Sequence, residues 1–124
     1  MSRPSRTVLV IDDDPAILRT VADILGDEGY DVVTAANGAE GLELLETVAP
    51  GLILLDMRMP VLDGWQFARS LDPGKRAIPL VVMTAAQDAR QWAREIGASG
   101  YVAKPFDLVE LLETVERQLD GQGP

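Results

Sequence analysis

Residues 7–15 read Thr-Val-Leu-Val-Ile-Asp-Asp-Asp-Pro, and the change of pattern inside this stretch decides the fold. Its first five residues are nearly all aliphatic, which is typical of a strand covered on both faces. Its last two, Asp14 and Pro15, are typical of the N-cap and the first position of a helix. An apolar strand that leads directly into a helix predicts the first half of a βαβ unit.

The same alternation continues outward along the chain. Five short apolar runs predict strands, at Thr7 to Ile11, Asp31 to Ala35, Leu52 to Leu55 running into Asp56, Leu80 to Thr84, and Gly100 to Ala103. The second run is more polar than the others, which places it at an edge of the sheet. Apolar residues recur at helical spacing between the runs, and the later helices are expected to begin at the caps Asn37, Asp63, Asp88 and Asp107. The segment Asp72-Pro73-Gly74 is expected to be a simple exit turn.

Five strands that alternate with five helices predict a doubly wound α/β domain, because each parallel crossover must be right-handed. In a chain of 124 residues, the five-stranded, flavodoxin-like order 2-1-3-4-5 is favoured over the longer six-stranded order. We therefore expect a parallel sheet flanked by five helices, in one domain over residues 1–120. Residues 121–124, Gly-Gln-Gly-Pro, are expected to form a linker-like or frayed tail.

Composition excludes several classes of function. The chain has no histidine and no cysteine, which rules out disulfide scaffolds, thiol catalysis, histidine-dependent triads, and zinc sites built from Cys or His. Its 20 acidic and 11 basic residues give a net charge of −9, which disfavours binding to nucleic acid or to an anionic membrane. No apolar run reaches the roughly 18 residues of a membrane span, and the first residues lack the pattern of a secretory signal. We therefore expect a soluble, cytoplasmic protein.

Polar side chains gather where the predicted strands end. Ligands of a doubly wound sheet bind beyond the carboxyl ends of the strands, here between the first and third. The residues at these ends are Asp12, Asp13, Asp56, Thr84 and Lys104. Clustered carboxylates repel one another unless a cation neutralises them. Mg²⁺ suits such a site because it prefers oxygen ligands, and Mn²⁺ is the alternative ion.

A carboxylate, a lysine, a hydroxyl and a magnesium ion are also the groups that phosphoryl transfer uses. Because the chain has no histidine or cysteine, a carboxylate is the expected acceptor, and Asp56 at the end of the most apolar strand is the best candidate. Taken singly, Asp56, Thr84 and Lys104 could be a turn residue, a strand-end hydroxyl and a surface lysine. Asp14 is better explained as a helix cap than as a metal ligand. The convergence of the others on one rim favours a site.

Four segments of the sequence together match a known family. They are Val8 to Pro15, Leu54 to Pro60 followed by Asp63-Gly64, Val82 to Ala85, and Gly97 to Phe106. With these motifs in this order, the chain resembles the receiver domain of two-component response regulators over essentially its whole length.

The resemblance implies a role for each residue on the rim. Asp56 would accept a phosphoryl group from a phosphohistidine on a sensor histidine kinase or a phosphotransfer protein. Asp13, Asp56 and the backbone carbonyl of Arg58 would hold the magnesium ion directly, and Asp12 would act through a water molecule. Such a domain catalyses only its own phosphorylation and dephosphorylation, and it is otherwise not an enzyme.

The resemblance also implies a switch. Lys104 and Thr84 would contact the phosphoryl group, the peptide bond before Pro105 would be cis, and Tyr101 would turn inward once Thr84 moves. Phosphorylation would then change the surface of the fourth helix, fifth strand and fifth helix. That surface would contact a downstream protein or output domain, or form a homodimer. No nucleic acid or membrane would bind this domain directly.

Two departures from the family pattern affect these expectations. Thr84 and Lys104 are 20 positions apart, which is shorter than the family's usual spacing, so the region of the fourth helix is expected to differ. Arg58 and Ala86 stand two positions after Asp56 and Thr84, where the family tunes the lifetime of the phosphoryl group, and we expect Arg58→Ala to change that lifetime. Trp92 falls on the inward stripe of its helix, and Trp65 is a hypothetical reporter of metal binding.

Two other functions compete with the receiver interpretation. A phosphatase of the haloacid dehalogenase type, with Asp12 as nucleophile, also uses a strand-end aspartate and magnesium, but Ala16 replaces the threonine of its first motif and the chain is short for that fold. A receiver-like module that binds partners without accepting phosphate is the third alternative. The intact set of Asp13, Asp56, Thr84 and Lys104 argues against it.

Overall fold

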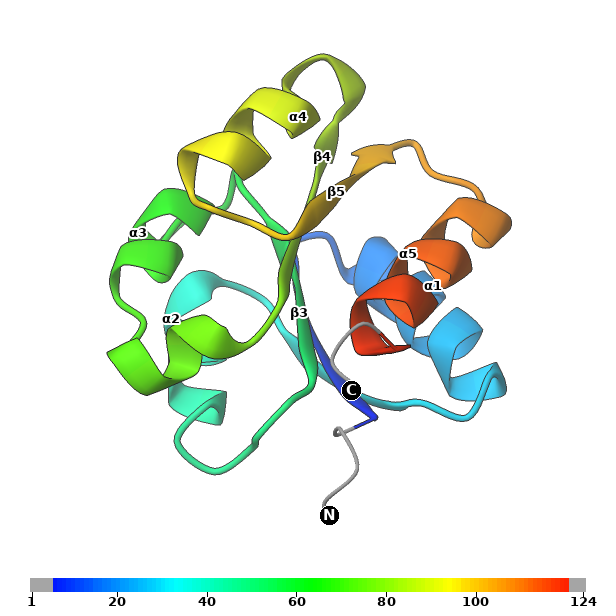
Figure 1. Ribbon diagram of the computed structural model, residues 1–124, viewed down its shortest axis with the longest axis horizontal. Helices are drawn as coiled ribbons and strands as arrows, with labels where there is room; N and C mark the ends of the chain where they lie inside the picture. Colours follow the sequence, from blue (N-terminus) through cyan, green and yellow to red (C-terminus); the bar gives the residue numbers. More distant parts are fainter. Residues whose placement is uncertain (1–5, 121–124) are drawn as a thin grey trace.

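The computed structural model describes residues 6–120, in which a central parallel sheet lies between two layers of helices (Figure 1). The strands are β1 (Thr7–Ile11), β2 (Asp31–Ala35), β3 (Leu52–Asp56), β4 (Leu80–Ala85) and β5 (Gly100–Lys104). The helices are α1 (Pro15–Asp27), α2 (Gly38–Leu44), α3 (Gly64–Arg69), α4 (Ala86–Glu95) and α5 (Leu108–Asp120), with a short 3-10 helix, η1 (Pro73–Ala77). The tail expected at 121–124 lies outside the described residues.

The strand order is β2-β1-β3-β4-β5, and every neighbouring pair is parallel. The predicted order 2-1-3-4-5 is therefore confirmed, and β2 lies at an edge as expected. The winding reverses between β1 and β3, where Ile11 pairs with Leu55. Because the two strands run in the same direction, Asp12, which follows β1, and Asp56, the last residue of β3, arrive at the same edge of the sheet.

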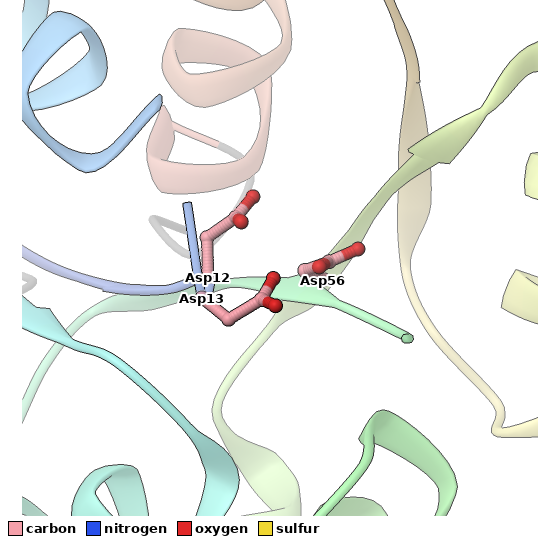
Figure 2. A group of neighbouring side chains, drawn as sticks. All are labelled: Asp12, Asp13 and Asp56. Atoms are coloured by element: carbon pink, nitrogen blue, oxygen red, sulfur yellow. The ribbon is translucent and has the colours of Figure 1, made fainter. Parts of the chain in front are cut away.

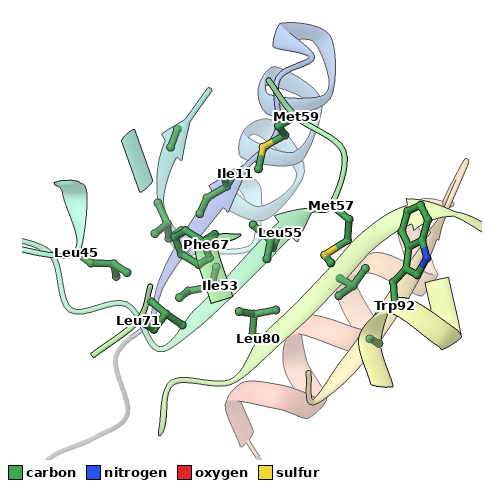
Figure 3. Close-up of a cluster of buried hydrophobic side chains, with 14 residues drawn as sticks. Ile11, Leu45, Ile53, Leu55, Met57, Met59, Phe67, Leu71, Leu80 and Trp92 are labelled. Atoms are coloured by element: carbon green, nitrogen blue, oxygen red, sulfur yellow. The ribbon is translucent and has the colours of Figure 1, made fainter. Parts of the chain in front are cut away.

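Alternating side chains of each strand build two separate cores. Along β1, Val8 and Val10 pack into the core beneath α1 and α5, while Leu9 and Ile11 pack beneath α2, α3 and α4. Phe67 of α3 is fully buried in the second core (Figure 3). Both faces of the sheet are thus covered, which explains why β1, β3 and β4 are almost continuously apolar.

Side-chain caps fix where most helices begin. The carboxylate of Asp14 accepts from the N–H of Ala16, and the side chains of Asn37, Asp63 and Asp107 cap α2, α3 and α5 in the same way. The expected cap at Asp88 is wrong. β4 continues to Ala85 and α4 begins at the next residue, so Asp88 lies inside the first turn of the helix.

Two connections differ from expectation. The exit turn predicted at Asp72-Pro73-Gly74 continues as the 3-10 helix η1, because the N–H groups of Lys75 and Arg76 both bond to the carbonyl of Asp72. The direct passage from β4 to α4 accounts for the short spacing between Thr84 and Lys104. In the described part of the chain, no helix is both long enough and apolar enough to span a bilayer.

Candidate functional site

Three carboxylates meet at the carboxyl ends of β1 and β3. Each of Asp12, Asp13 and Asp56 offers an oxygen, and these oxygens lie within 4.8 Å of one another (Figure 2). Asp12 and Asp56 are buried, whereas Asp13 is exposed to solvent. The sequence predicted this cluster from the strand ends alone, because parallel strands in register deliver their last residues to one place.

Lys104, the last residue of β5, reaches across the sheet edge to this cluster. Its Nζ donates to Oδ2 of Asp12 at 2.6 Å and lies 3.7 Å from Oδ1 of Asp56. The other oxygen of Asp12 accepts from the N–H of Asp14 at 3.0 Å. Both oxygens of Asp12 are therefore engaged, and the ammonium group lies closer to Asp12 than to Asp56.

Burial is the main reason that the pKa of Asp56 is raised, from 3.8 to about 6. The negative charge of Asp12 raises this pKa further, and that of Asp13 adds a smaller contribution in the same direction. The Lys104 ammonium group lowers it, and so does the backbone N–H of Arg58. At neutral pH Asp56 is thus ionised, and its negative charge is only partly neutralised by the groups around it. A bound cation would neutralise the remaining charge.

Thr84 and Tyr101 occupy different surroundings. Thr84 is buried near the end of β4, where it pairs in register with Ala103, the neighbour of Lys104. Tyr101 of β5 is 45% exposed. Since its neighbour Val102 packs under α5, Tyr101 lies on the opposite face of β5, the side covered by α4. The structure therefore places Thr84 at the rim and Tyr101 outside it.

One group of contacts near the rim was not anticipated by the sequence. The guanidinium of Arg58, two residues after Asp56, lies 5.1 Å from the ring centre of Trp92 on α4. Trp92 packs edge-to-face against Trp65 of α3, with ring centres 4.9 Å apart. The helical stripe correctly predicted that Trp92 is buried, but nothing in the local sequence indicates a contact between positions 58 and 92.

Comparison with known proteins assigns this arrangement to a family. The family described as the response regulator receiver domain matches residues 8–116, which is nearly the whole of the described chain. The chain belongs to this family. The receiver domain also has the cis bond between Lys104 and Pro105 that the resemblance implied.

Relatives of this receiver domain include regulators of different lengths. It is 38% identical over 114 residues to the transcriptional regulatory protein PdtaR of Mycobacterium tuberculosis, which covers 90% of this chain and 55% of that protein. It is 33% identical to the sporulation initiation phosphotransferase F of Bacillus subtilis, covering 90% of this chain and 92% of that protein. The receiver domain thus spans about half the length of PdtaR and nearly all of the sporulation protein.

Solved structures agree on the fold. A putative response regulator from Chloroflexus aurantiacus J-10-fl superposes with a TM-score of 0.87 at 31% identity, covering 94% of this chain and 98% of the other. A second structure is the receiver domain of the sensor histidine kinase PA1611 from Pseudomonas aeruginosa PAO1, which has magnesium coordinated in its active-site cleft. It superposes with a TM-score of 0.84 at 29% identity, covering 94% of this chain and 98% of the other. Receiver domains act as phosphoryl acceptors in two-component signalling, so the family match favours this function over the phosphatase and over the inert module.

Proposed function

We propose that this receiver domain accepts a phosphoryl group on Asp56 and passes the signal through its α4, β5 and α5 surface. The observation that carries the proposal is the difference between the two buried aspartates. Asp12 has one oxygen on Lys104 and the other on a backbone N–H, which lowers its reactivity as a nucleophile. Asp56 lies in the same cluster with its charge less fully compensated.

The transfer follows from this arrangement. An oxygen of Asp56 attacks the phosphorus atom of a phosphohistidine on the partner, the P–N bond breaks, and the imidazole nitrogen leaves with the electron pair and takes up a proton. Lys104 is 3.7 Å from Asp56 and offsets the charge on the phosphoryl oxygens. Thr84 donates its hydroxyl from the neighbouring strand. Burial of the acceptor limits the access of water, which would hydrolyse the product.

The residues present fit a divalent ion. Three carboxylate oxygens within 4.8 Å, together with the raised pKa of Asp56, form a hard-oxygen site whose repulsion a cation would relieve. Asp13 and Asp56 would hold Mg²⁺ or Mn²⁺ directly, with the carbonyl of Arg58, and Asp12 would act through water. Such an ion supplies positive charge to the phosphoryl oxygens. The magnesium in the related domain of PA1611 supports this assignment.

The partners follow from the family and from the exposed surface. A sensor histidine kinase or a phosphotransfer protein would supply the phosphoryl group at the acidic rim. Tyr101, Leu108 and Val109 are exposed on β5 and α5, so this surface offers apolar contacts to a downstream protein, an output domain or a second copy of the chain. Tyr101 is the residue proposed to turn inward when Thr84 engages the phosphoryl group.

Intact mass spectrometry after incubation with a small acyl phosphate and Mg²⁺ tests the proposal. We expect one added phosphoryl group, and none when a chelator removes the ion or when Asp56 is replaced in Asp56→Asn. Asp63→Asn is the matched control, because Asp63 lies in the loop after β3 and caps α3, a role that asparagine also fills. An unmodified wild type, or an Asp56→Asn variant that is modified equally well, would contradict the proposal.

A further inference from the structure

The two tryptophans of the chain form a single cluster that joins three segments around the rim. Trp65 of α3 and Trp92 of α4 are in edge-to-face contact. The indole N–H of Trp65 donates to Glu95 of α4 at 2.9 Å, and Gln91 donates to the other oxygen of Glu95 at 3.0 Å. This bond to Trp65 lowers the pKa of Glu95. Together with Arg58 on Trp92, the cluster ties α4 to α3 and to the loop after β3.

Arg58 is the part of this cluster nearest to the chemistry. It is exposed, and only one residue separates it from Asp56. Within residues 6–120, the ion pairs involve Lys75 and Lys104, whereas the guanidinium of Arg58 lies against the face of Trp92. Because the guanidinium of Arg58 is itself exposed to water, its contact with the ring face is weak. It therefore remains available to a stronger partner close by.

Phosphorylation of Asp56 would create such a partner. A phosphoryl group adds a charge of about −1.5 to −2 and three acceptor oxygens. Charge-assisted hydrogen bonds from a guanidinium to these oxygens are stronger than its contact with an aromatic face. The backbone N–H of Arg58 already faces the Asp56 carboxylate, so the arginine is attached at the point where the new charge appears.

The direct connection between β4 and α4 makes this helix responsive to the loss of the contact between Arg58 and Trp92. β4 ends at Ala85 and α4 begins at Ala86, so no flexible loop separates Thr84 from the helix. Trp92 is two turns further along the same helix. A change in the contacts of Trp92 and a change in the position of Thr84 therefore act on one rigid element.

We propose that Arg58 is a positioning residue that rests on Trp92 in the unmodified domain and moves to the phosphoryl oxygens once Asp56 is modified, releasing α4 from the loop after β3. This rests on the proposed function of Asp56. The consequence is a second connection between the site and α4, independent of Tyr101. It depends on the planar guanidinium, because a lysine ammonium stacks less well on an indole.

Tryptophan emission measures this directly, because Trp65 and Trp92 are the only tryptophans in the chain and both lie in the cluster. On modification with a small acyl phosphate and Mg²⁺, the guanidinium of Arg58 leaves the face of Trp92 and exposes the ring to water. We therefore expect the emission maximum of the wild type to move to longer wavelength. Arg58→Ala should show the longer wavelength before modification and lose most of the further shift. Arg58→Lys should retain part of the shift, and Trp65→Phe should retain it with Trp92 as the sole emitter.

Arg90→Ala is the matched control, since Arg90 is an exposed arginine on the same helix, and it should shift as the wild type does. Intact mass on each sample separates the two proposals. If the wild type gains no phosphoryl group, the proposed function fails. If Asp56 is modified but the emission does not shift, or shifts equally in Arg58→Ala, the role of Arg58 is wrong and the proposed function stands.

Discussion

Asp12 and Asp56 share one rim and differ in what compensates their charge. Lys104 and the N–H of Asp14 engage both oxygens of Asp12, which is fully buried. Asp56 is 6% exposed and lies 3.7 Å from the same ammonium group, so the pKa of Asp56 is raised to about 6. In the absence of a metal ion, the ionised Asp56 therefore destabilises the fold at neutral pH.

The raised pKa of Asp56 predicts that the stability gained by Asp56→Asn depends on pH when a chelator is present. The pKa of Asp56 is higher in the folded state than its usual 3.8, so the folded state holds the proton more tightly and loses stability as the pH rises from about 4 to above 6. The amide cannot ionise and avoids this loss. We expect the variant to be more stable than the wild type by about 1 to 3 kcal/mol at pH 7.5.

Urea denaturation at a series of pH values measures this difference. The advantage of Asp56→Asn should shrink steadily as the pH falls below 6, because the wild-type side chain then becomes protonated and resembles the amide. Asp63→Asn should show no such trend. A difference between Asp56→Asn and the wild type that stays constant from pH 4 to pH 7.5 would show that the charge of Asp56 is not its cause.

Val61 is strained in the loop after β3. Its φ angle is 74°, in the left-handed region, although valine is β-branched. The side chain is 77% exposed, so packing does not compensate the strain. The turn is closed by a bond from the N–H of Leu62 to the carbonyl of Pro60 at 2.9 Å, which holds Val61 in this conformation.

Relief of this strain predicts that Val61→Gly stabilises the domain by about 1 kcal/mol, after the greater flexibility of glycine in the unfolded chain is included. Val61→Ala is the control, because alanine keeps the Cβ atom that causes the strain and should change stability little. Thermal and urea unfolding of both variants measure the effect. A loss of stability in Val61→Gly would contradict this, because it would mean that the valine side chain stabilises the fold by more than the strained φ angle destabilises it.

At the scale of elements, the close packing of α3 against the end of β3 positions Asp56. The N–H of Gly64 donates to the carbonyl of Met57 at 2.9 Å, and a Cβ atom at Gly64 would lie 2.8 Å from the Cα of Met57. Backbone atoms cannot move aside as a flexible side chain can. Glycine is therefore required here by the approach of two backbones.

Gly64→Ala should consequently destabilise the domain by about 1 to 3 kcal/mol and slow phosphorylation, because the clash displaces the residue next to Asp56. Gly26→Ala in α1 is the opposite case, since nothing lies within 4 Å of its Cβ position, and it should stabilise the helix by about 0.5 to 1 kcal/mol. Urea unfolding and the rate of modification by acyl phosphate measure both effects. Equal effects of the two substitutions would contradict this account of the β3–α3 contact.

The element most poorly predicted from the sequence is α4. The sequence predicts that Asp88 caps a helix whose buried face begins at Ala89. The helix instead begins at Ala86 and has no side-chain cap. The strand hydrogen bonds of β4 extend to Ala85 because Lys104 pairs with it in register. This pairing joins residues far apart in the chain, so local helix signals could not reveal it.

Over the whole molecule, the alternation of five strands with helices in a chain of 124 residues was sufficient to predict the sheet order, since right-handed crossovers leave few topologies. The acidic cluster was predictable for the same reason, because Asp12 directly follows β1 and Asp56 ends β3, the neighbouring parallel strand. Contacts that depend on the relative placement of helices were not predictable. Arg58 on Trp92 and Trp65 on Glu95 each join side chains about thirty positions apart, with no periodicity to indicate the pairing.

Mg²⁺ should stabilise the whole domain through the acidic cluster. An ion that binds only the folded state adds about 2.7 kcal/mol to the free energy of unfolding at one hundred times its dissociation constant. Asp13→Asn should lose most of this gain, because Asp13 supplies one of the clustered oxygens, whereas Asp107→Asn, a helix cap outside the cluster, should keep it. Urea unfolding with and without Mg²⁺ measures the gain, and equal gains in the two variants would remove the acidic cluster as the binding site.

Asp56, and not Asp12, is the residue that we propose becomes phosphorylated. Reduction of the modified domain with borohydride converts an aspartyl phosphate to homoserine, and peptide mass spectrometry then locates the altered residue. We expect homoserine at position 56 alone, in the peptide that contains Leu54, Leu55 and Met57. Homoserine at position 12 would instead support the phosphatase chemistry and contradict the account.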